Sequence, residues 1–134
     1  MKIEIIDFGY EIEPNRAHED DAGLDVYATD TRVLEPGEVY SMGLGFGVKI
    51  PAGFCGFITC RSSMAKEGIV TALTPIDAGY TGEVHAILMN KSNKPGLIAR
   101  HQKIAQLVIL PCILCDLVKK KKSRGNNAFG STGK

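Results

Sequence analysis

The sequence predicts an all-β fold, a jelly-roll-like barrel or sandwich, from short apolar runs and closely spaced turns. Most runs alternate apolar and polar residues, which is typical of half-buried strands. Clusters of Gly, Pro, Asn and Asp lie between them and favour tight turns. With 134 residues, 44% of them hydrophobic, one domain can bury an aliphatic core. The predicted strands lie within residues 2–8, 23–28, 32–51, 53–60, 83–90, 96–111 and 112–118.

Two local segments add detail to this fold. Residues 61–70, "RSSMAKEGIV", are the one stretch with helical character, and Gly68 should end that helix after about one turn. Residues 76–84, "IDAGYTGEV", predict a hairpin in which Gly79 and Gly82 adopt positive φ angles.

The apolar pattern stops after Lys122, so we divide the chain into a β-domain and an arm. Residues 1–122 form the predicted domain. Residues 123–134 contain only Ala128 and Phe129 as apolar groups, and we expect this C-terminal arm to be mobile in the isolated subunit.

Charge and hydropathy narrow the class of protein. The formal net charge is +1, which gives no reason to expect a nucleic-acid or membrane partner. No N-terminal signal pattern is present, and no run approaches the roughly 18 apolar residues of a membrane helix. These features predict a soluble, cytoplasmic protein.

The four cysteines leave two interpretations open. The spacing Cys112-x-x-Cys115 could form half of a zinc site or a redox pair. We favour buried thiols in an apolar strand, because residues i and i+3 of a strand point to opposite faces. The three histidines are scattered and predict no metal site.

Several polar stretches predict an anion-binding site. Arg61, Ser62 and Ser63 follow an apolar strand, and a guanidinium with two hydroxyls suits a phosphate. Asp77 and Tyr80 flank a predicted tight turn. Each stretch alone is also common in ordinary surface turns, and the chain has no Walker motif. Together with Asp25 at a glycine turn and a glycine-rich arm, they indicate a phosphorylated small molecule.

Five segments resemble, in order, the five motifs of the trimeric dUTP pyrophosphatases (dUTPases). The resemblance covers nearly the whole chain and implies a jelly-roll homotrimer with a flexible C-terminal arm. It also implies hydrolysis of dUTP to dUMP and pyrophosphate with Mg²⁺ on the triphosphate, at active sites that each draw on three subunits. This reaction supplies dUMP and keeps uracil out of DNA. The segments are 22–28, 51–65, 75–84, 103–108 and 124–133.

The resemblance assigns the third motif to the chemistry and to the nucleoside. Asp77 would activate the attacking water and contact the sugar, and a carboxylate suits such general-base work. Tyr80 would lie against the deoxyribose and leave no room for a 2′-hydroxyl. The backbone of Pro75, Ile76 and Asp77, with that at His85, would contact the uracil edge.

The phosphate and metal roles come from the other motifs. Arg61, Ser62 and Ser63 match the phosphate-binding residues of the second motif, and Gln106 matches the glutamine near the phosphates. Asp25 would support Mg²⁺ indirectly, through water, since Mg²⁺ often binds mainly to nucleotide phosphates.

The arm completes the site implied by the resemblance. Arg124, Ser131 and Thr132 match residues that contact the γ-phosphate. Phe129 matches the aromatic ring that stacks over uracil, and Gly130 lies in the same binding segment.

This sequence departs from the family pattern in two places. Thr74 and Pro75 stand where a glycine and an aliphatic residue are usual, and Pro75 has no N–H to donate. Residues 127–128, Asn and Ala, replace two glycines of the arm.

Two other functions compete with dUTP hydrolysis. The related dCTP deaminases need a glutamate in the strand after the third motif, and Ile87 occupies that place here. A non-catalytic nucleotide-binding trimer is the second alternative.

Overall fold

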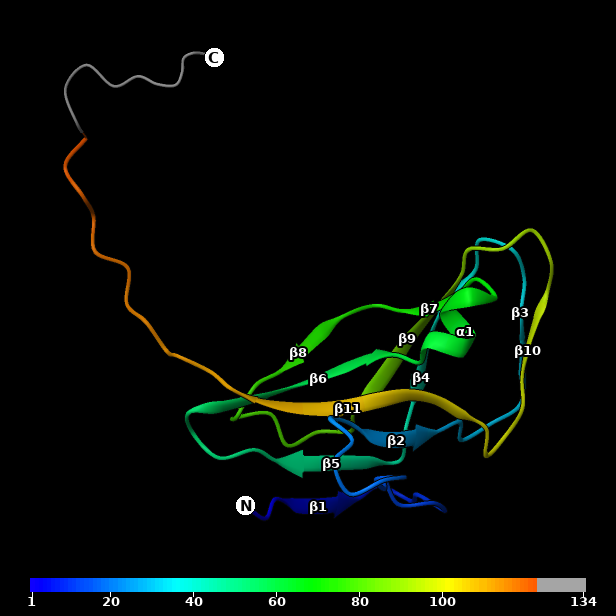
Figure 1. Cartoon of the computed structure of the whole chain (residues 1–134), viewed down its shortest axis with the longest axis horizontal. Helices are drawn as coiled ribbons and strands as arrows, with labels where there is room; N and C mark the ends of the chain where they lie inside the picture. Colours follow the sequence, from blue (N-terminus) through cyan, green and yellow to red (C-terminus); the bar gives the residue numbers. More distant parts are fainter. Residues whose placement is uncertain (123–134) are drawn as a thin grey trace.

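The computed structural model describes residues 1–122 and confirms the all-β prediction, with one short helix among eleven strands (Figure 1). The elements are β1 (Glu4–Asp7), β2 (Leu24–Tyr27), β3 (Arg32–Leu34), β4 (Val39–Gly43), β5 (Phe46–Lys49), β6 (Phe54–Cys60), α1 (Ser62–Lys66), β7 (Ile69–Thr71), β8 (Thr74–Ile76), β9 (His85–Asn90), β10 (Gly96–Ile98) and β11 (Lys103–Pro111).

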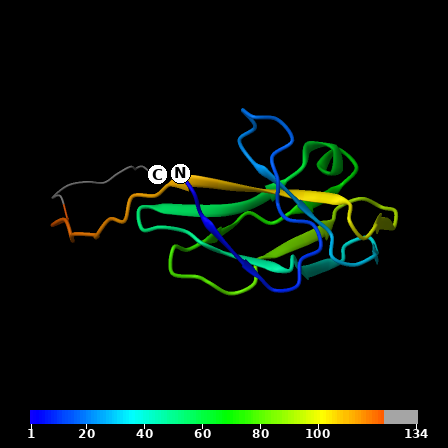
Figure 2. The same ribbon diagram turned by 90° about the horizontal axis from the view of Figure 1, so that it is seen from below.

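The strands form four small antiparallel sheets around one core, in a jelly-roll-like arrangement. The largest has the order β2-β11-β6-β8, and the second has the order β4-β9-β7. Two further pairs, β1–β5 and β10–β3, complete the domain. Strand β11 is the longest; its first half pairs with β2 and most of its length pairs with β6, so it lies between the two (Figure 1), and Figure 2 shows the same ribbon turned by 90°.

The core collects aliphatic side chains from every sheet. Alternation along β9 shows how the two faces are set: Ala86 and Leu88 are fully buried, whereas His85 is exposed and Ile87 half-buried. The period of two therefore directs His85 and Ile87 away from the core. The largest fully buried residues are Phe46, Leu34, Met42, Ile58, Leu88, Ile98, Ile104, Val26 and Asn90.

The predicted helical turn is confirmed. Helix α1 ends at Lys66 with Glu67 as its C-cap, and Gly68 follows with φ of +93°. A Cβ at this glycine would lie 2.8 Å from Cβ of Ser92, so the position needs glycine for both its backbone angle and its space.

The predicted hairpin is wrong in its pairing. Strand β8 pairs with β6, while β9 pairs with β4 and β7, so the loop between them joins two different sheets. Gly79 and Gly82 do not have positive φ angles. Gly82 is instead required for space, because a Cβ there would lie 2.7 Å from the Tyr80 hydroxyl.

The predicted strand over residues 112–118 is also wrong. Strand β11 ends at Pro111, and the following residues extend away from the sheet without strand pairing up to residue 122 (Figures 1 and 2). The expectation of buried thiols fails most clearly at Cys115, which is exposed, while the other three thiols are half-buried. Hydrophobicity alone predicted a strand here, but the domain offers these side chains no partner.

Within residues 1–122, no helix has the length and apolar character needed to cross a membrane.

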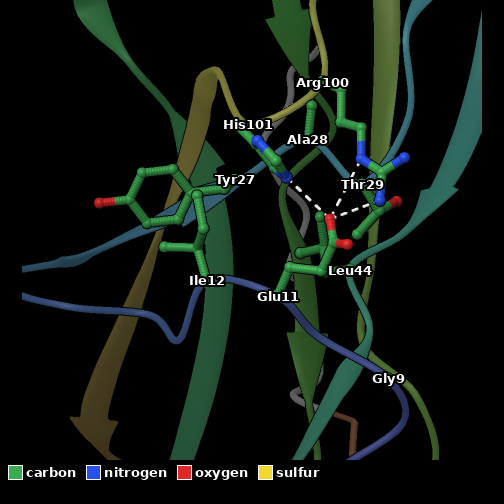
Figure 3. Close-up of a pocket in the computed structure, with 9 residues that line it drawn as sticks. All are labelled: Gly9, Glu11, Ile12, Tyr27, Ala28, Thr29, Leu44, Arg100 and His101. Atoms are coloured by element: carbon green, nitrogen blue, oxygen red, sulfur yellow. Dashed lines mark hydrogen bonds and ion pairs between the residues drawn. The ribbon is translucent and has the colours of Figure 1, made fainter.

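An ion-pair cluster fastens the N-terminal segment to the turn before β11. Glu11 contacts both Arg100 and His101, with 2.7 Å between Glu11 Oε1 and His101 Nε2, beside a small cavity of about 110 Å³ (Figure 3). His101 has φ of +71°, an uncommon backbone angle that the bond from its N–H to the Ala28 carbonyl helps to hold. Hydrogen bonds from Arg100 and then His101 lower the pKa of Glu11 from 4.5 to about 2.

We expect Glu11→Gln to destabilise the domain at neutral pH but not in strong acid. Since the folded-state pKa is depressed, the stabilisation is complete above about pH 4.5 and disappears as the pH falls toward 2. Thermal melts followed by circular dichroism should show a variant Tm a few degrees below wild type at pH 7, with the gap closing in acid. Glu4→Gln is the control, because Glu4 makes a single exposed pair with Lys49 at 3.5 Å. A Tm difference that is constant with pH would contradict this account.

Candidate active site

Strand β6 separates two groups of predicted site residues. Arg61 follows its last residue, whereas Asp77 lies near its first, because Ile76 pairs with Gly56. In Figure 1, α1 lies at one end of β6 and the segment after β8 lies at the other. The strand spacing puts roughly 15–20 Å between the two groups within one chain.

The first group gathers where β2, β11 and β6 run side by side. Gln106 of β11 pairs with Asp25 of β2 on one side and with Thr59 of β6 on the other. Asp25 is buried, and its carboxylate lies 3.1 Å from Lys103 Nζ. Arg61 donates from Nη1 to the Lys103 carbonyl at 3.4 Å. The structure thus brings together Asp25, Arg61 and Gln106 as predicted.

Gly23 keeps the side chain of Gln106 in place. A Cβ at position 23 would lie 2.8 Å from Gln106 Oε1 and 2.9 Å from its Cβ. A glycine is therefore needed because the glutamine side chain occupies that space. The "AGLD" segment contributes room for Gln106 as well as the carboxylate of Asp25.

Ser62 and Ser63 begin helix α1 directly after Arg61. Both are exposed, and Arg61 is half-buried. A guanidinium and two hydroxyls consequently follow one another at the end of β6, where the guanidinium contacts the backbone of Lys103. Because Asp25 neutralises Lys103, the guanidinium of Arg61 remains the main cation for an anionic ligand here.

The second group surrounds a pocket of about 250 Å³ between β8 and β9. Asp77 and Tyr80 form its turn, closed by the Tyr80 N–H bonding to the Asp77 carbonyl at 3.0 Å. The Tyr80 hydroxyl donates to the Glu83 carbonyl at 2.7 Å, which fixes the ring beside the pocket. The pocket is lined by Thr74, Pro75, Ile76, Asp77, Tyr80, Glu83, Val84, His85 and Ile87.

Two backbone edges face this pocket without strand partners. Strand β8 pairs only with β6 among the described residues, and β7 pairs with β9 only from Leu88 onward. The backbone of Pro75 and that of His85 are thus open toward the space between them, because Thr74 and Ile76 face β6 while Val84 and Ala86 face β4. Such edges can hydrogen-bond a flat polar ligand in the way a strand would.

Pro75 changes what its edge can offer. It lies opposite Phe57, and since proline cannot donate, the ladder bonds of β8 must run through Thr74 and Ile76. The backbone of Pro75 therefore faces the pocket and presents a carbonyl there with no N–H.

Glu83 anchors the pocket loop, and the sequence interpretation missed it. Its Oε2 accepts a bond from the Gly45 N–H at 2.9 Å. A Cβ at Gly43 would lie 2.6 Å from the same oxygen, so this glycine makes room for the carboxylate. The glutamate directly follows Gly82 in the "GYTGE" segment. A second carboxylate so close to Asp77 along the chain is the sequence signal that could have pointed to it.

His85 lies beside Glu83 on the outward face of β9. Its Nδ1 is 3.2 Å from Ser41 Oγ, and its Nε2 is 3.9 Å from Glu83 Oε1. The imidazole is therefore oriented by contacts on both sides. The sequence assigned only the backbone at this position to the site.

The described residues contain no group of three or more His, Cys, Asp or Glu side chains placed to hold a metal ion. Five predicted contacts lie outside the described residues: Arg124, Phe129, Gly130, Ser131 and Thr132.

An all-β domain with a guanidinium and two hydroxyls at one end of a strand and a carboxylate beside a pocket fits a hydrolase of phosphorylated small molecules. A family model described as dUTPase matches residues 10–133, and the chain belongs to this family. Relatives named deoxyuridine 5′-triphosphate nucleotidohydrolase include those of Clostridium tetani, 37% identical over 90% of this chain and 88% of the relative, and Corynebacterium glutamicum, 41% identical over 90% and 87%.

Solved structures of similar fold are also dUTPases. The enzyme from phage phi11 of S. aureus has a TM-score of 0.85 and 25% identity, covering 93% of this chain and 100% of that one. Its structure describes the coordination of a structural Mg(II) ion. The Staphylococcus bacteriophage 80alpha dUTPase with dUpNHpp has a TM-score of 0.81 and 25% identity over 92% of this chain and 99% of that one.

We expect Glu83→Ala to loosen the pocket loop. It removes a charged acceptor from the Gly45 N–H, a loss of about 1–2 kcal/mol in the free energy of unfolding. Chemical denaturation should show that loss, and hydrogen exchange at Gly45 should become faster. Glu83→Gln keeps an oxygen acceptor and should retain most of the protection. Equal exchange in the alanine variant and wild type would refute the anchoring role.

Proposed function

We propose that this dUTPase binds and cleaves dUTP at sites that are each completed by more than one subunit of a homotrimer. The enzyme hydrolyses dUTP to dUMP and pyrophosphate, as the names of its relatives and the family model support. The observation that carries the shared site is the separation of Asp77 from Arg61 at the two ends of β6. A triphosphate bound at one end cannot place its α-phosphorus at the other end of the same chain.

Asp77 is the proposed general base. Its side chain is exposed at the mouth of the pocket, where it can take a proton from water. Deprotonation strengthens the attack of water on the α-phosphorus, and the pyrophosphate leaves. The backbone bond from the Tyr80 N–H to the Asp77 carbonyl holds the turn that carries this carboxylate.

The pocket between β8 and β9 is the proposed uracil site. Its open backbone edges suit a base with alternating acceptors and one donor. The Tyr80 ring, held by the Glu83 carbonyl, would pack against the deoxyribose and exclude a 2′-hydroxyl by size.

The surface formed by Arg61, Ser62 and Ser63 is the proposed phosphate site of a neighbouring subunit. Its guanidinium can bind phosphate oxygens in a bidentate manner while the hydroxyls fill remaining acceptor sites. Gln106 lies at the same place on β11, where Gly23 leaves room for its amide.

The residues here fit Mg²⁺ as a partner of the triphosphate. Asp25 already pairs with Lys103, so its carboxylate can hold a water of the ion while substrate oxygens supply the direct ligands. When bound, Mg²⁺ would neutralise charge on the phosphates.

The arm is proposed to complete the site from a third subunit. Arg124, Ser131 and Thr132 would bind the γ-phosphate, and Phe129 with Gly130 would cover the base. The whole assembly requires no membrane or nucleic-acid partner, and we propose the cytoplasm as its location.

Deamination is disfavoured by the pocket itself. Ile87 lines it on the outward face of β9, where the related deaminases would need a glutamate. An apolar side chain cannot transfer a proton to or from the base.

Mixed trimers test the shared site. We expect Asp77→Asn and Arg61→Ala each to lose at least about 100-fold in turnover. Refolding the two variants together at equal amounts should restore about a quarter of wild-type activity, because each site then draws its two halves at random. Pyrophosphate release is the assay, and light scattering confirms the trimer. Activity no higher than that of either variant alone would show that the site lies within one subunit.

Pro75→Val tests the base pocket. The change returns an N–H to the edge facing the pocket, and one added hydrogen bond should lower KM for dUTP about 2–10-fold. Pyrophosphate release would be compared for dUTP, UTP, dTTP and dCTP, with Pro95→Val as a control proline outside this pocket. An unchanged KM for all four nucleotides would mean that residue 75 does not contact the base.

A further inference from the structure

Two of the four thiols meet across the β6–β11 ladder. Cys55 pairs with Leu110, and two residues further along β11 the Cys112 N–H bonds to the Gly53 carbonyl at 2.8 Å. Residues two apart in a strand point to the same face, so Cys112 projects on the same side of the sheet as Cys55, as its diagonal neighbour.

The surroundings leave room for the two sulfurs to approach. Gly53, opposite Cys112, has φ of +90° and open space where a Cβ would lie. No side chain projects from Gly53 to block the approach of the Cys112 thiol toward Cys55. Both side chains are half-buried, so a small oxidant can reach them.

The contact is also visible in the electrostatics of Cys55. Burial first, then the neighbouring thiol of Cys112 and finally the charge of Asp77 raise the pKa of the Cys55 thiol. The same three groups are therefore neighbours: two thiols and the proposed general base.

We propose that Cys55 and Cys112 are a redox modification site that a peroxide converts into an intramolecular disulfide. The peroxide O–O bond breaks as one thiol becomes a sulfenic acid, with loss of one water. The second thiol then attacks that sulfur, the S–S bond forms, and a second water leaves. Two thiols lose two electrons in total, and the peroxide gains them.

The chain can adjust to form this bond. Beyond Cys112, residues 113–122 make no strand pairing, so the backbone there can move the short distance that disulfide geometry requires. The other two thiols are differently placed. Cys60 Sγ lies between the Thr71 N–H at 3.1 Å and the Thr71 carbonyl at 3.4 Å. Cys115, three residues after Cys112, is exposed.

The disulfide would act on the pocket end of β6. It ties the point where the chain leaves β11 to the residue beside Gly56, whose partner Ile76 precedes Asp77. Oxidation should therefore shift Asp77 and lower the turnover of dUTP. This consequence rests on the proposed role of Asp77, whereas disulfide formation does not.

The test uses the full-length assembled protein and hydrogen peroxide. After oxidation, unfolding and capture with N-ethylmaleimide, intact mass should show two adducts instead of the four of the reduced chain. Peptide mapping should identify the Cys55–Cys112 link, and dithiothreitol should reverse it. Cys115→Ser should behave as wild type, whereas Cys55→Ser and Cys112→Ser should form no intramolecular disulfide.

Activity is measured on the same samples. Wild type and Cys115→Ser should lose turnover severalfold on oxidation and regain it on reduction, while Cys55→Ser and Cys112→Ser keep theirs. A Cys112–Cys115 link, an intersubunit link, or four free thiols after treatment would overturn the proposal. A Cys55–Cys112 link without loss of turnover would overturn the proposed effect of the disulfide on the active site. If Asp77 does not act as the general base, the reduced Asp77→Asn variant will keep full activity. That result is independent of whether the disulfide forms.

Discussion

The pairing of β11 with β2 on one side and β6 on the other is the constraint on which the rest of the structure depends. It fixes Asp25, Gln106 and Thr59 in one row across the sheet. The same ladder sets the length of β6 that separates this row from Asp77. Because strand spacing is nearly invariant, the two halves of the site cannot be brought together by local adjustment. The proposal of an active site shared between subunits rests on this separation along one strand.

Glycines make this arrangement possible by providing space more often than by turning the chain. Gly23 leaves room for Gln106, Gly43 for the Glu83 carboxylate and Gly82 for the Tyr80 hydroxyl. At each of these positions the smallest side chain allows a polar group to approach the backbone closely. Positive φ is needed elsewhere, for example at Gly68 after the helix. In this chain, each of these three polar side chains therefore depends on a glycine that leaves space for it.

Sequence patterns predicted the strands well and their partners poorly. Alternation located β6, β9 and β11, and the polar stretches located Asp25, Arg61 and Asp77, because both signals are local. The hairpin prediction at residues 76–84 failed since two strands joined by a short loop need not pair, and here each finds a better partner in another sheet. The strand prediction for residues 112–118 failed for a different reason. An apolar run forms a strand only where it can pair with the edge of a sheet. Glu11 and His101 of the ion-pair cluster lie ninety positions apart in the sequence, so no short motif could predict that they meet.

The open edges of β8 and β9 explain how the failed hairpin becomes a pocket. Had the two strands paired, their backbone groups would have satisfied each other and no pocket would lie between them. Pairing each strand to a different sheet leaves those groups free, at a cost in hydrogen bonds that a bound ligand can offset. Pro75 fits this logic, because a proline is tolerated only where a strand edge lacks a partner. Its presence in β8 makes pairing with β9 less favourable at that position, and so the residue that removes one donor from the pocket also helps to keep the pocket open.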